Sequence, residues 1–266
     1  MRGRVLIVAG SDSGGGAGIQ ADLKTVTMLG AFGATAITAL TAQNTLGVHG
    51  VVPVDPAFIR QQMRVVLDDI GADVVKTGML HDVPVIEAVA SELDASSPRP
   101  RVVVDPVMVA KGGAPLLVET ARQALVALLL PRADVVTPNA PEAAALTGID
   151  VQNEADLRRA GEKLLALGAR AAWMKGGHLE GDEVVDVLVA QAEGELVLRS
   201  PRRATRSTHG TGCTLASALA ASLAQGLSLH DAARRAHDYV ARAIDHAPGL
   251  GKGHGPLGHG WPLLRG

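Results

Sequence analysis

The feature that most constrains the fold is a regular alternation of short β-branched runs with amphipathic stretches along the chain. The run RVLIVAG (4–10) is followed by a helical pattern at 17–29, and ATAITALTAQ (34–43) is followed by another at 56–69. Alternation of this kind is typical of a mostly parallel sheet that carries helices on both faces. The sequence therefore predicts an α/β fold.

The alternation continues to residue 177 and then changes. DVVKTG, RVVVDP, ADVVTP and AAWMKGG end further predicted strands, whereas residues 183–198 indicate two strands around AEGE, which is a hairpin. Helical patterns at 211–225 and 228–247 and a tail rich in glycine, proline and histidine complete the chain. Because no repeat or long linker divides these elements, we expect a single domain over residues 1–266.

Composition excludes several classes of function. The chain has two Phe, two Trp and one Tyr, a net charge of −2 and a pI near 6.5. It therefore offers little attraction to nucleic acid or anionic lipid and little surface for base stacking. A single cysteine excludes an internal disulfide and a multi-thiolate metal site. No apolar run approaches the ~18 residues of a membrane span, and the opening run is too short for a signal peptide, so we expect a cytoplasmic protein.

Polar and glycine residues follow the predicted strands, at the point where each strand ends. In open α/β sheets, ligands bind beyond the carboxyl ends of the strands. The sequence therefore predicts a ligand site at this edge. The segments concerned are GSDSGGGAG (10–18), Gln43 with Asn44, residues 77–79, Asp105 with Pro106, residues 137–139 and residues 175–177.

The first glycine loop, residues 14–18, follows a strand and opens a helix, so its N–H groups are placed to meet an anion. It contains G-x-G-x-x-A at 16–21, but the next strand ends in TAQN, without the acid that a dinucleotide fold requires. The string G-x-x-x-x-G-K-[ST] of a P-loop does not occur. A tight turn that needs glycine is the alternative interpretation.

The second glycine loop, residues 209–213, contains the only cysteine and precedes a helix rich in small residues. The N–H groups and dipole at a helix N-terminus favour negative charge, such as that on a transferring phosphoryl group. The same environment favours a thiolate, so we expect the pKa of Cys213 to lie below about 8.5. A structural turn with a small buried cysteine is the alternative.

Together with its other segments, the two glycine loops give the chain a specific resemblance to a known family. It rests on AGSDSGGGAGIQADLKT, TALTAQNTLGV, VVKTGML, VVVDPVMVAKGGAPLL, VVTPNAPEAAALTG, MKGGHLEG and THGTGCTLASALAA, in that order. Together these segments resemble the hydroxymethylpyrimidine/phosphomethylpyrimidine kinases of thiamin biosynthesis, which are ribokinase-like. The resemblance implies ATP-dependent phosphorylation of 4-amino-5-hydroxymethyl-2-methylpyrimidine and then of its monophosphate, giving the diphosphate. It also implies Mg²⁺ as the metal, a small-molecule pyrimidine as the partner, and a homodimer.

The resemblance implies a pyrimidine pocket around Gln43. An amide donates and accepts at once, which matches an amino group beside a ring nitrogen. Asp22, Met79 and Val107 would complete this pocket. Considered alone, Met79 and Val107 fit a place in the core better than a pocket, and Asp22 fits a helix surface equally well.

On the nucleotide side, the resemblance places Asn139 and Glu142 near Mg²⁺ and the ATP phosphates, with Asp105 as a further metal ligand. Mg²⁺ takes few carboxylates and keeps several waters. Lys175 would neutralise phosphate oxygens, and Lys111 would lie on a flap. An ordinary helix cap is the alternative for Asn139 and Glu142.

The resemblance implies that Cys213 accepts the proton of the substrate hydroxymethyl group. The N–H groups of Gly210, Thr211, Gly212 and Cys213 would hold the phosphoryl oxygens. Gly14 and Ala114 depart from the family pattern, which has Ser and often an acid there. A pyridoxal or pyridoxine kinase is the nearest alternative. A non-catalytic pyrimidine-binding protein and a dinucleotide-dependent oxidoreductase are more distant ones.

Overall fold

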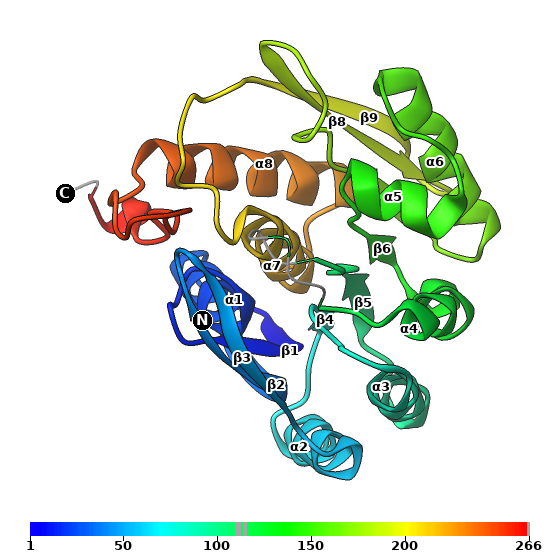
Figure 1. Ribbon diagram of the computed structural model, residues 1–266. Helices are drawn as coiled ribbons and strands as arrows, with labels where there is room; N and C mark the ends of the chain where they lie inside the picture. The colour runs from blue at the N-terminus through cyan, green and yellow to red at the C-terminus, as the bar shows by residue number, and fades with distance from the viewer. Residues whose placement is uncertain (110–112, 114–115, 265–266) are drawn as a thin grey trace.

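A computed structural model describes residues 1–109, 113 and 116–264 (Figure 1). One sheet orders its strands β3-β2-β1-β4-β5-β6-β7-β8-β9. The strands from β2 to β7 in this order are parallel, while β3, β8 and β9 are antiparallel to their neighbours. The strands are β1 (Arg4–Asp12), β2 (Phe32–Asn44), β3 (Gly47–Pro53), β4 (Val74–Thr77), β5 (Arg101–Val104), β6 (Val135–Val136), β7 (Ala171–Met174), β8 (Glu183–Ala190) and β9 (Gly194–Pro201).

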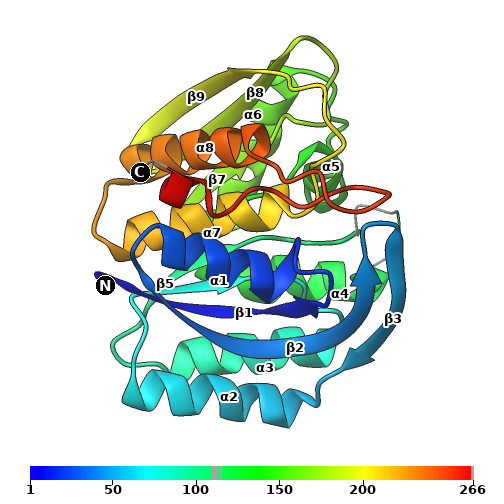
Figure 2. The same cartoon turned by 90° about the vertical axis from the view of Figure 1, so that its left-hand side faces the viewer.

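Helices cover both faces of the sheet, which confirms the predicted α/β architecture (Figures 1 and 2). Short π and 3₁₀ turns at 125–132 continue α4, and a 3₁₀ turn (Trp261–Leu264) ends the described chain. The helices are α1 (Gly18–Met28), α2 (Pro56–Asp69), α3 (Val83–Ala95), α4 (Glu119–Ala124), α5 (Ala140–Thr147), α6 (Glu154–Ala166), α7 (Thr211–Ala224) and α8 (Leu229–Asp245).

Strand β1 shows why the core has two halves. Val5, Ile7 and Ala9 pack with α1, α7 and α8, while Leu6 and Val8 pack with α2 and α3 on the other face. Successive side chains of a strand point to opposite faces, so a central strand buried on both sides must be apolar throughout. This continuous apolar run is the pattern that predicted the strand from the sequence.

The predicted hairpin at 183–198 is confirmed as β8 and β9. A second hairpin, β2 with β3, extends the other edge of the sheet and was not predicted. No residue of β3 is buried, so its sequence carries no apolar periodicity that could mark it.

The tail after α8 lies across the edge of the sheet that carries the glycine loops (Figure 2). The His254 N–H donates to the carbonyl of Thr45 at 2.9 Å, and the His209 N–H donates to the carbonyl of Gly255 at 3.1 Å. The tail therefore joins the β2–β3 hairpin to the second glycine loop. None of the helices in the described ranges is long and apolar enough to cross a membrane.

Candidate active site

The second glycine loop and the first lie against each other. Gly210 adopts φ +83°, and a Cβ there would lie 1.8 Å from the carbonyl oxygen of Gly16. Only glycine allows this backbone conformation and this close approach together. Helix α7 begins at the next residue, Thr211, whose N–H donates to the Thr208 carbonyl at 3.4 Å, so the N–H groups of Gly212 and Cys213 face the edge where the parallel strands end.

Lys175 brings a positive charge to the same place. A Cβ at Gly212 would lie 3.1 Å from Lys175 Nζ. The Lys175 ammonium donates to Asp105 Oδ1 at 3.1 Å and lies 3.9 Å from Glu142 Oε2. Burial alone would lower the pKa of Lys175, but Asp105 and Glu142 outweigh it and raise the pKa, so the group stays charged. The α7 N-terminus and this cation form one electropositive region.

Asn139 and Glu142 form a capping box at the start of α5. Asn139 Oδ1 accepts from the Glu142 N–H at 2.9 Å, and Glu142 Oε2 accepts from the Asn139 N–H at 2.8 Å. Burial raises the pKa of Glu142 to about 7, with Lys175 opposing the rise and Asp105 adding to it. The pair is therefore a helix cap, and Glu142 also lies within reach of the Lys175 charge.

The carboxylate of Asp105 fits a hard cation. Its Oδ1 accepts from Lys175 and from Thr137 Oγ1 at 3.2 Å, whereas its buried Oδ2 has no hydrogen-bond partner among the described residues. An unpartnered buried carboxylate oxygen is costly unless a ligand or water meets it. The described ranges hold no group of three or more His, Cys, Asp or Glu side chains able to bind a metal.

Three of the predicted pocket residues lie at this edge. The Gln43 amide nitrogen is 3.3 Å from His209 Nε2, and its amide oxygen is 3.2 Å from Thr41 Oγ1. Met79 is 8% exposed, and its sulfur lies 3.1 Å from the place of a Cβ at Gly10. Val107 is partly exposed. The Gln43 amide therefore lies beside His209 and Thr41 at this edge.

The fourth predicted pocket residue, Asp22, is not at a pocket surface. Its side chain is 0% exposed and is ion-paired with Lys76, whose side chain is also 0% exposed. Its Oδ1 accepts from the Ser217 hydroxyl at 2.7 Å. The Asp22 oxygens therefore have protein partners inside the core, and the contact of Asp22 with the pyrimidine stays a prediction.

The first glycine loop already surrounds an anion of the chain itself. The N–H groups of Gly14, Gly16 and Ala17 donate to the buried carboxylate of Asp12 at 2.8, 3.0 and 2.8 Å. His209 Nε2 lies 2.8 Å from Asp12 Oδ2. The prediction that this loop meets an external anion was wrong for these N–H groups, and the alternative of a glycine turn holds.

The surroundings of Cys213 also differ from expectation. Burial raises the pKa of Cys213 to about 12, although Lys76 and a hydrogen bond from the Gly18 N–H oppose the rise. The expected lowering by the helix N-terminus was wrong, because loss of hydration and the nearby carboxylates of Asp22 and Asp105 outweigh it. At neutral pH this partly buried thiol keeps its proton.

The sequence interpretation missed Asp12, His209 and Lys76. An Asp two residues before a glycine turn is a common signal for side-chain bonds to the turn N–H groups, so Asp12 could have been found. His209 directly precedes the GTGC string and gave no separate signal. Lys76 lies inside an apolar strand pattern, where a buried cation cannot be recognised without its partner.

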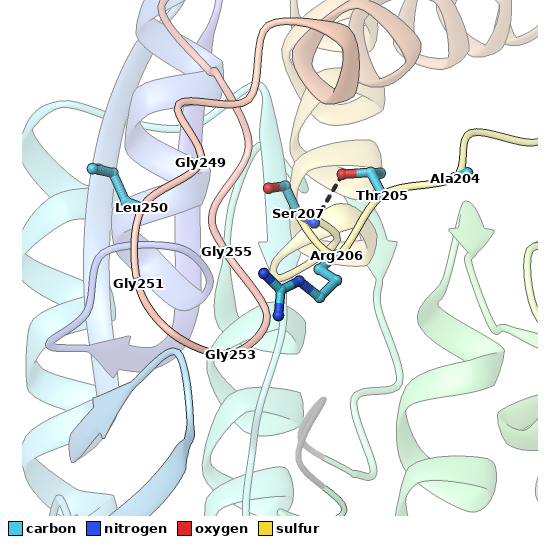
Figure 3. A pocket seen from close by; sticks show the side chains of 9 residues that line it. All are labelled: Ala204, Thr205, Arg206, Ser207, Gly249, Leu250, Gly251, Gly253 and Gly255. Atoms are coloured by element: carbon cyan, nitrogen blue, oxygen red, sulfur yellow. Dashed lines mark hydrogen bonds between the residues drawn. The ribbon is translucent and has the colours of Figure 1, made fainter.

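Arginines in the basic segment before the second glycine loop largely pair with other groups of the same chain. Arg202 donates to backbone carbonyls, including that of Gly177, and Arg203 pairs with Asp245. Arg206 is exposed and lines a cavity of about 510 Å³ between residues 204–207 and 249–255 (Figure 3). Lys111 and Ala114 lie outside the described residues.

Comparison with known proteins decides the family. The phosphomethylpyrimidine kinase family model matches residues 12–258. The chain belongs to this family. A hydroxymethylpyrimidine/phosphomethylpyrimidine kinase of Streptomyces coelicolor is 53% identical over 97% of the chain and 95% of its own length. The thiamine biosynthesis bifunctional protein ThiED of Geobacter sulfurreducens is 54% identical over 97% of the chain, which spans only 52% of that protein.

Solved structures of two kinds resemble this fold. A Bacillus subtilis pyridoxal kinase in an ADP complex has a TM-score of 0.91 and 39% identity, covering 100% of both chains. A phosphomethylpyrimidine kinase of Clostridium difficile has a TM-score of 0.79 and 40% identity, covering 91% of this chain and 99% of its own. The backbone is therefore common to both kinds of kinase, and the family is assigned by the sequence match.

Proposed function

We propose that the chain is an ATP-dependent kinase that phosphorylates 4-amino-5-hydroxymethyl-2-methylpyrimidine and then its monophosphate, giving the diphosphate. The observation that carries the proposal is the meeting of the α7 N-terminus with Lys175 and Asp105 in a member of this family. Such a region stabilises the charge that develops on a transferred phosphoryl group. Relatives about half identical to this chain are named for both reactions.

On the nucleotide side, the N–H groups of residues 210–213 and the Lys175 ammonium bind the phosphoryl oxygens. Asp105 and Glu142 would hold Mg²⁺, which neutralises phosphate charge when bound. A loose phosphoryl-transfer transition state needs chiefly this positioning and charge stabilisation. The free Oδ2 of Asp105 supports its assignment as a metal ligand.

On the acceptor side, Gln43 reads the pyrimidine edge, and Met79 and Val107 contact the ring faces. His209 and Thr41 lie beside the Gln43 amide, at 3.3 Å from its nitrogen and 3.2 Å from its oxygen.

Cys213 is proposed to take the proton of the substrate hydroxyl. Its contribution to the rate is smaller than that of the charge stabilisation. It would act as the thiolate, after release of its own proton to solvent, and its raised pKa keeps that form scarce at neutral pH, which is the reason for the smaller contribution. We expect Cys213→Ala to lower kcat roughly tenfold, below the ~10²–10⁴ range of general bases, because the transition state asks little of the nucleophile. A near-normal kcat in a steady-state assay would remove the base role and leave the anion site intact.

The test of the function is MgATP-dependent phosphorylation of hydroxymethylpyrimidine, its monophosphate and pyridoxal, with products resolved by mass. The proposal predicts pyrimidine diphosphate as the main product and slow turnover of pyridoxal. Pyridoxal kinase is the second candidate, favoured by the TM-score of 0.91. Pyridoxal phosphate as the dominant product would establish it and would overturn the assignment of Gln43.

A homodimer is also proposed, on the family resemblance. Large apolar side chains are exposed on the β2–β3 hairpin and α2, among them Leu46, Val52, Phe58 and Val65. Exposed apolar surface of this kind suits an interface between subunits. Light scattering coupled to size exclusion would give the mass, and a monomer at micromolar concentration would contradict the proposal.

A further inference from the structure

His209 lies between the first glycine loop and the amide of Gln43. Its Nε2 is 2.8 Å from Asp12 Oδ2, at the end of β1, and 3.3 Å from the Gln43 amide nitrogen, near the end of β2. The imidazole ring fits there because Gly16 has no side chain: a Cβ at Gly16 would lie 2.5 Å from His209 Cδ2. His209 and Asp12 are both buried. One ring nitrogen therefore faces a carboxylate and an amide at the same time.

The carboxylate decides the role of this nitrogen. Burial would raise the pKa of Asp12, but hydrogen bonds from His209 and from two backbone N–H groups outweigh it and lower the pKa, so Asp12 is ionised at neutral pH. A carboxylate only accepts hydrogen bonds, so His209 Nε2 carries a hydrogen, in the neutral ring as in the imidazolium. That hydrogen points to Asp12 at 2.8 Å, and the nitrogen cannot accept a further one from the Gln43 amide.

Thr41 decides the other contact of the amide. Its hydroxyl lies 2.8 Å from the carbonyl oxygen of Ser11 and 3.2 Å from Gln43 Oε1. A hydroxyl has one hydrogen, and the shorter contact takes it, so the Thr41 oxygen faces Gln43 as an acceptor. With its nitrogen beside His209 and its oxygen beside Thr41, the amide would set donor against donor and acceptor against acceptor. A half-turn of the amide exchanges its two ends and makes both contacts favourable.

We propose that His209, held by Asp12, is a positioning residue that orients the Gln43 amide with its oxygen toward His209 and its nitrogen toward Thr41. One lone pair and one N–H of the amide then remain for a ligand, in a fixed order along the edge of the pocket. The inference deepens the proposed function and rests on it for the identity of the ligand. The fixed order selects the 4-amino pyrimidine against its 4-oxo analogue, in which the donor and the acceptor exchange places.

Binding of these two pyrimidines tests the orientation. Titration calorimetry without ATP gives the Kd of hydroxymethylpyrimidine and of its 4-oxo analogue, and the ratio of the two values is the readout. We expect wild type to favour the amino compound at least about 30-fold, since two hydrogen bonds become two repulsive contacts in the analogue. His209→Phe keeps a ring, removes the donor and should reduce this ratio about tenfold. His209→Gln returns a donor nitrogen at a similar reach and should restore the ratio to within about threefold of wild type.

Ser13→Ala is the matched control. The Ser13 hydroxyl donates to the Gln43 carbonyl at 2.9 Å and accepts from the Gln43 N–H at 2.8 Å, so it bonds the backbone of the same residue and not its amide. We expect Ser13→Ala to keep the ratio within about threefold of wild type. An unchanged ratio in His209→Phe, or an equal reduction in Ser13→Ala, would overturn the inference. If His209→Phe does not fold, Thr41→Val decides it, because it removes the acceptor of the amide nitrogen and should reduce the ratio likewise.

Failure of this inference is distinguishable from failure of the proposed function. An NMR spectrum of protein labelled at its nine histidines detects the hydrogen on His209 Nε2 without any ligand, and His209→Phe identifies the signal. A ring nitrogen without hydrogen would overturn the inference whatever the substrate. A ratio that depends on His209, with no phosphorylation of either pyrimidine, would support the orientation and refute the kinase assignment. Phosphorylation with an unchanged ratio would do the reverse.

A merely structural role of His209 predicts a different pattern. His209→Phe would then lower the unfolding midpoint and leave the amino-to-oxo ratio at its wild-type value. In steady-state assays, the positioning role predicts that His209→Phe raises the KM for the pyrimidine about tenfold and leaves the KM for MgATP within about twofold of wild type. An equal rise in both KM values would contradict it.

Discussion

The two glycine-rich loops meet at one edge of the sheet, yet their N–H groups have different partners. The first loop encloses the carboxylate of Asp12, which takes three of its N–H bonds. The second opens α7 beside Lys175, and no carboxylate of the described residues accepts a hydrogen bond from its N–H groups. A glycine loop before a helix is therefore an anion site only where the chain does not supply the anion. The comparison predicts that charge changes act on catalysis at the second loop and on stability at the first.

The largest effect is expected at Lys175. Lys175→Met removes the cation beside the α7 N-terminus and should lower kcat about 10³-fold, which is about 4 kcal/mol of transition-state stabilisation. Lys24→Met is the matched control at the first loop, where the exposed Lys24 donates to the Gly15 carbonyl at 2.8 Å. We expect that control to stay within about twofold of wild type.

Steady-state kinetics with saturating MgATP measure both variants, and thermal unfolding verifies that each is folded. If Lys175→Met kept kcat within tenfold of wild type, the α7 N-terminus alone would stabilise the phosphoryl group. If Lys24→Met lost as much activity as Lys175→Met, the contrast between the two loops would fail.

The second prediction concerns the contact between the loops. Gly210→Ala places a Cβ 1.8 Å from the Gly16 carbonyl at a backbone φ of +83°. We expect a loss of at least about 3 kcal/mol in unfolding free energy, because the clash adds to the ~1–2 kcal/mol cost of the left-handed conformation. Gly226→Ala is the control, since Gly226 has φ +88° with nothing within 4 Å of its Cβ position. If denaturant unfolding gave the same loss of unfolding free energy in both variants, the two loops could separate freely.

The sequence predicted those parts of the fold that depend on local burial. Strands such as Val74–Thr77 are buried on both faces, so they had to be apolar runs, and the connecting helices had to be amphipathic. It did not predict β3, whose side chains are exposed or half-buried. The place of the site was also predictable, because parallel strands end at one edge, and Asn139, Lys175 and Asp105 do meet there.

Pairing across long sequence separations was not predictable. Asp22 has the pattern of a helix acid, and its partner Lys76 is 54 residues away inside an apolar strand. The protonation of Cys213 depends on burial and on charges from separate elements, none of which the GTGC string contains. Local rules therefore identified the helix N-terminus correctly and gave the wrong direction for the pKa of the thiol that it carries.

The smallest effect is expected at Asp12. Asp12→Asn replaces a charged acceptor of three N–H groups and should lower the unfolding free energy at pH 7 by about 2 kcal/mol. Burial would raise the pKa of Asp12, but hydrogen bonds from His209, Ala17 and Gly14 outweigh it and lower the pKa. A carboxylate whose pKa is lowered on folding stabilises the folded state fully above its unfolded pKa of about 4. This stabilisation is lost as the pH falls below that value.

Unfolding curves of wild type and Asp12→Asn should therefore differ most at neutral pH and converge below about pH 4. Asp245→Asn is the control, because the exposed ion pair of Asp245 with Arg203 is worth less than about 1 kcal/mol. The kcat of Asp12→Asn should change much less than that of Lys175→Met. A larger kcat loss than at Lys175, with stability unchanged, would mean that the first loop binds the transferred phosphoryl group and that Asp12 is not its resident anion.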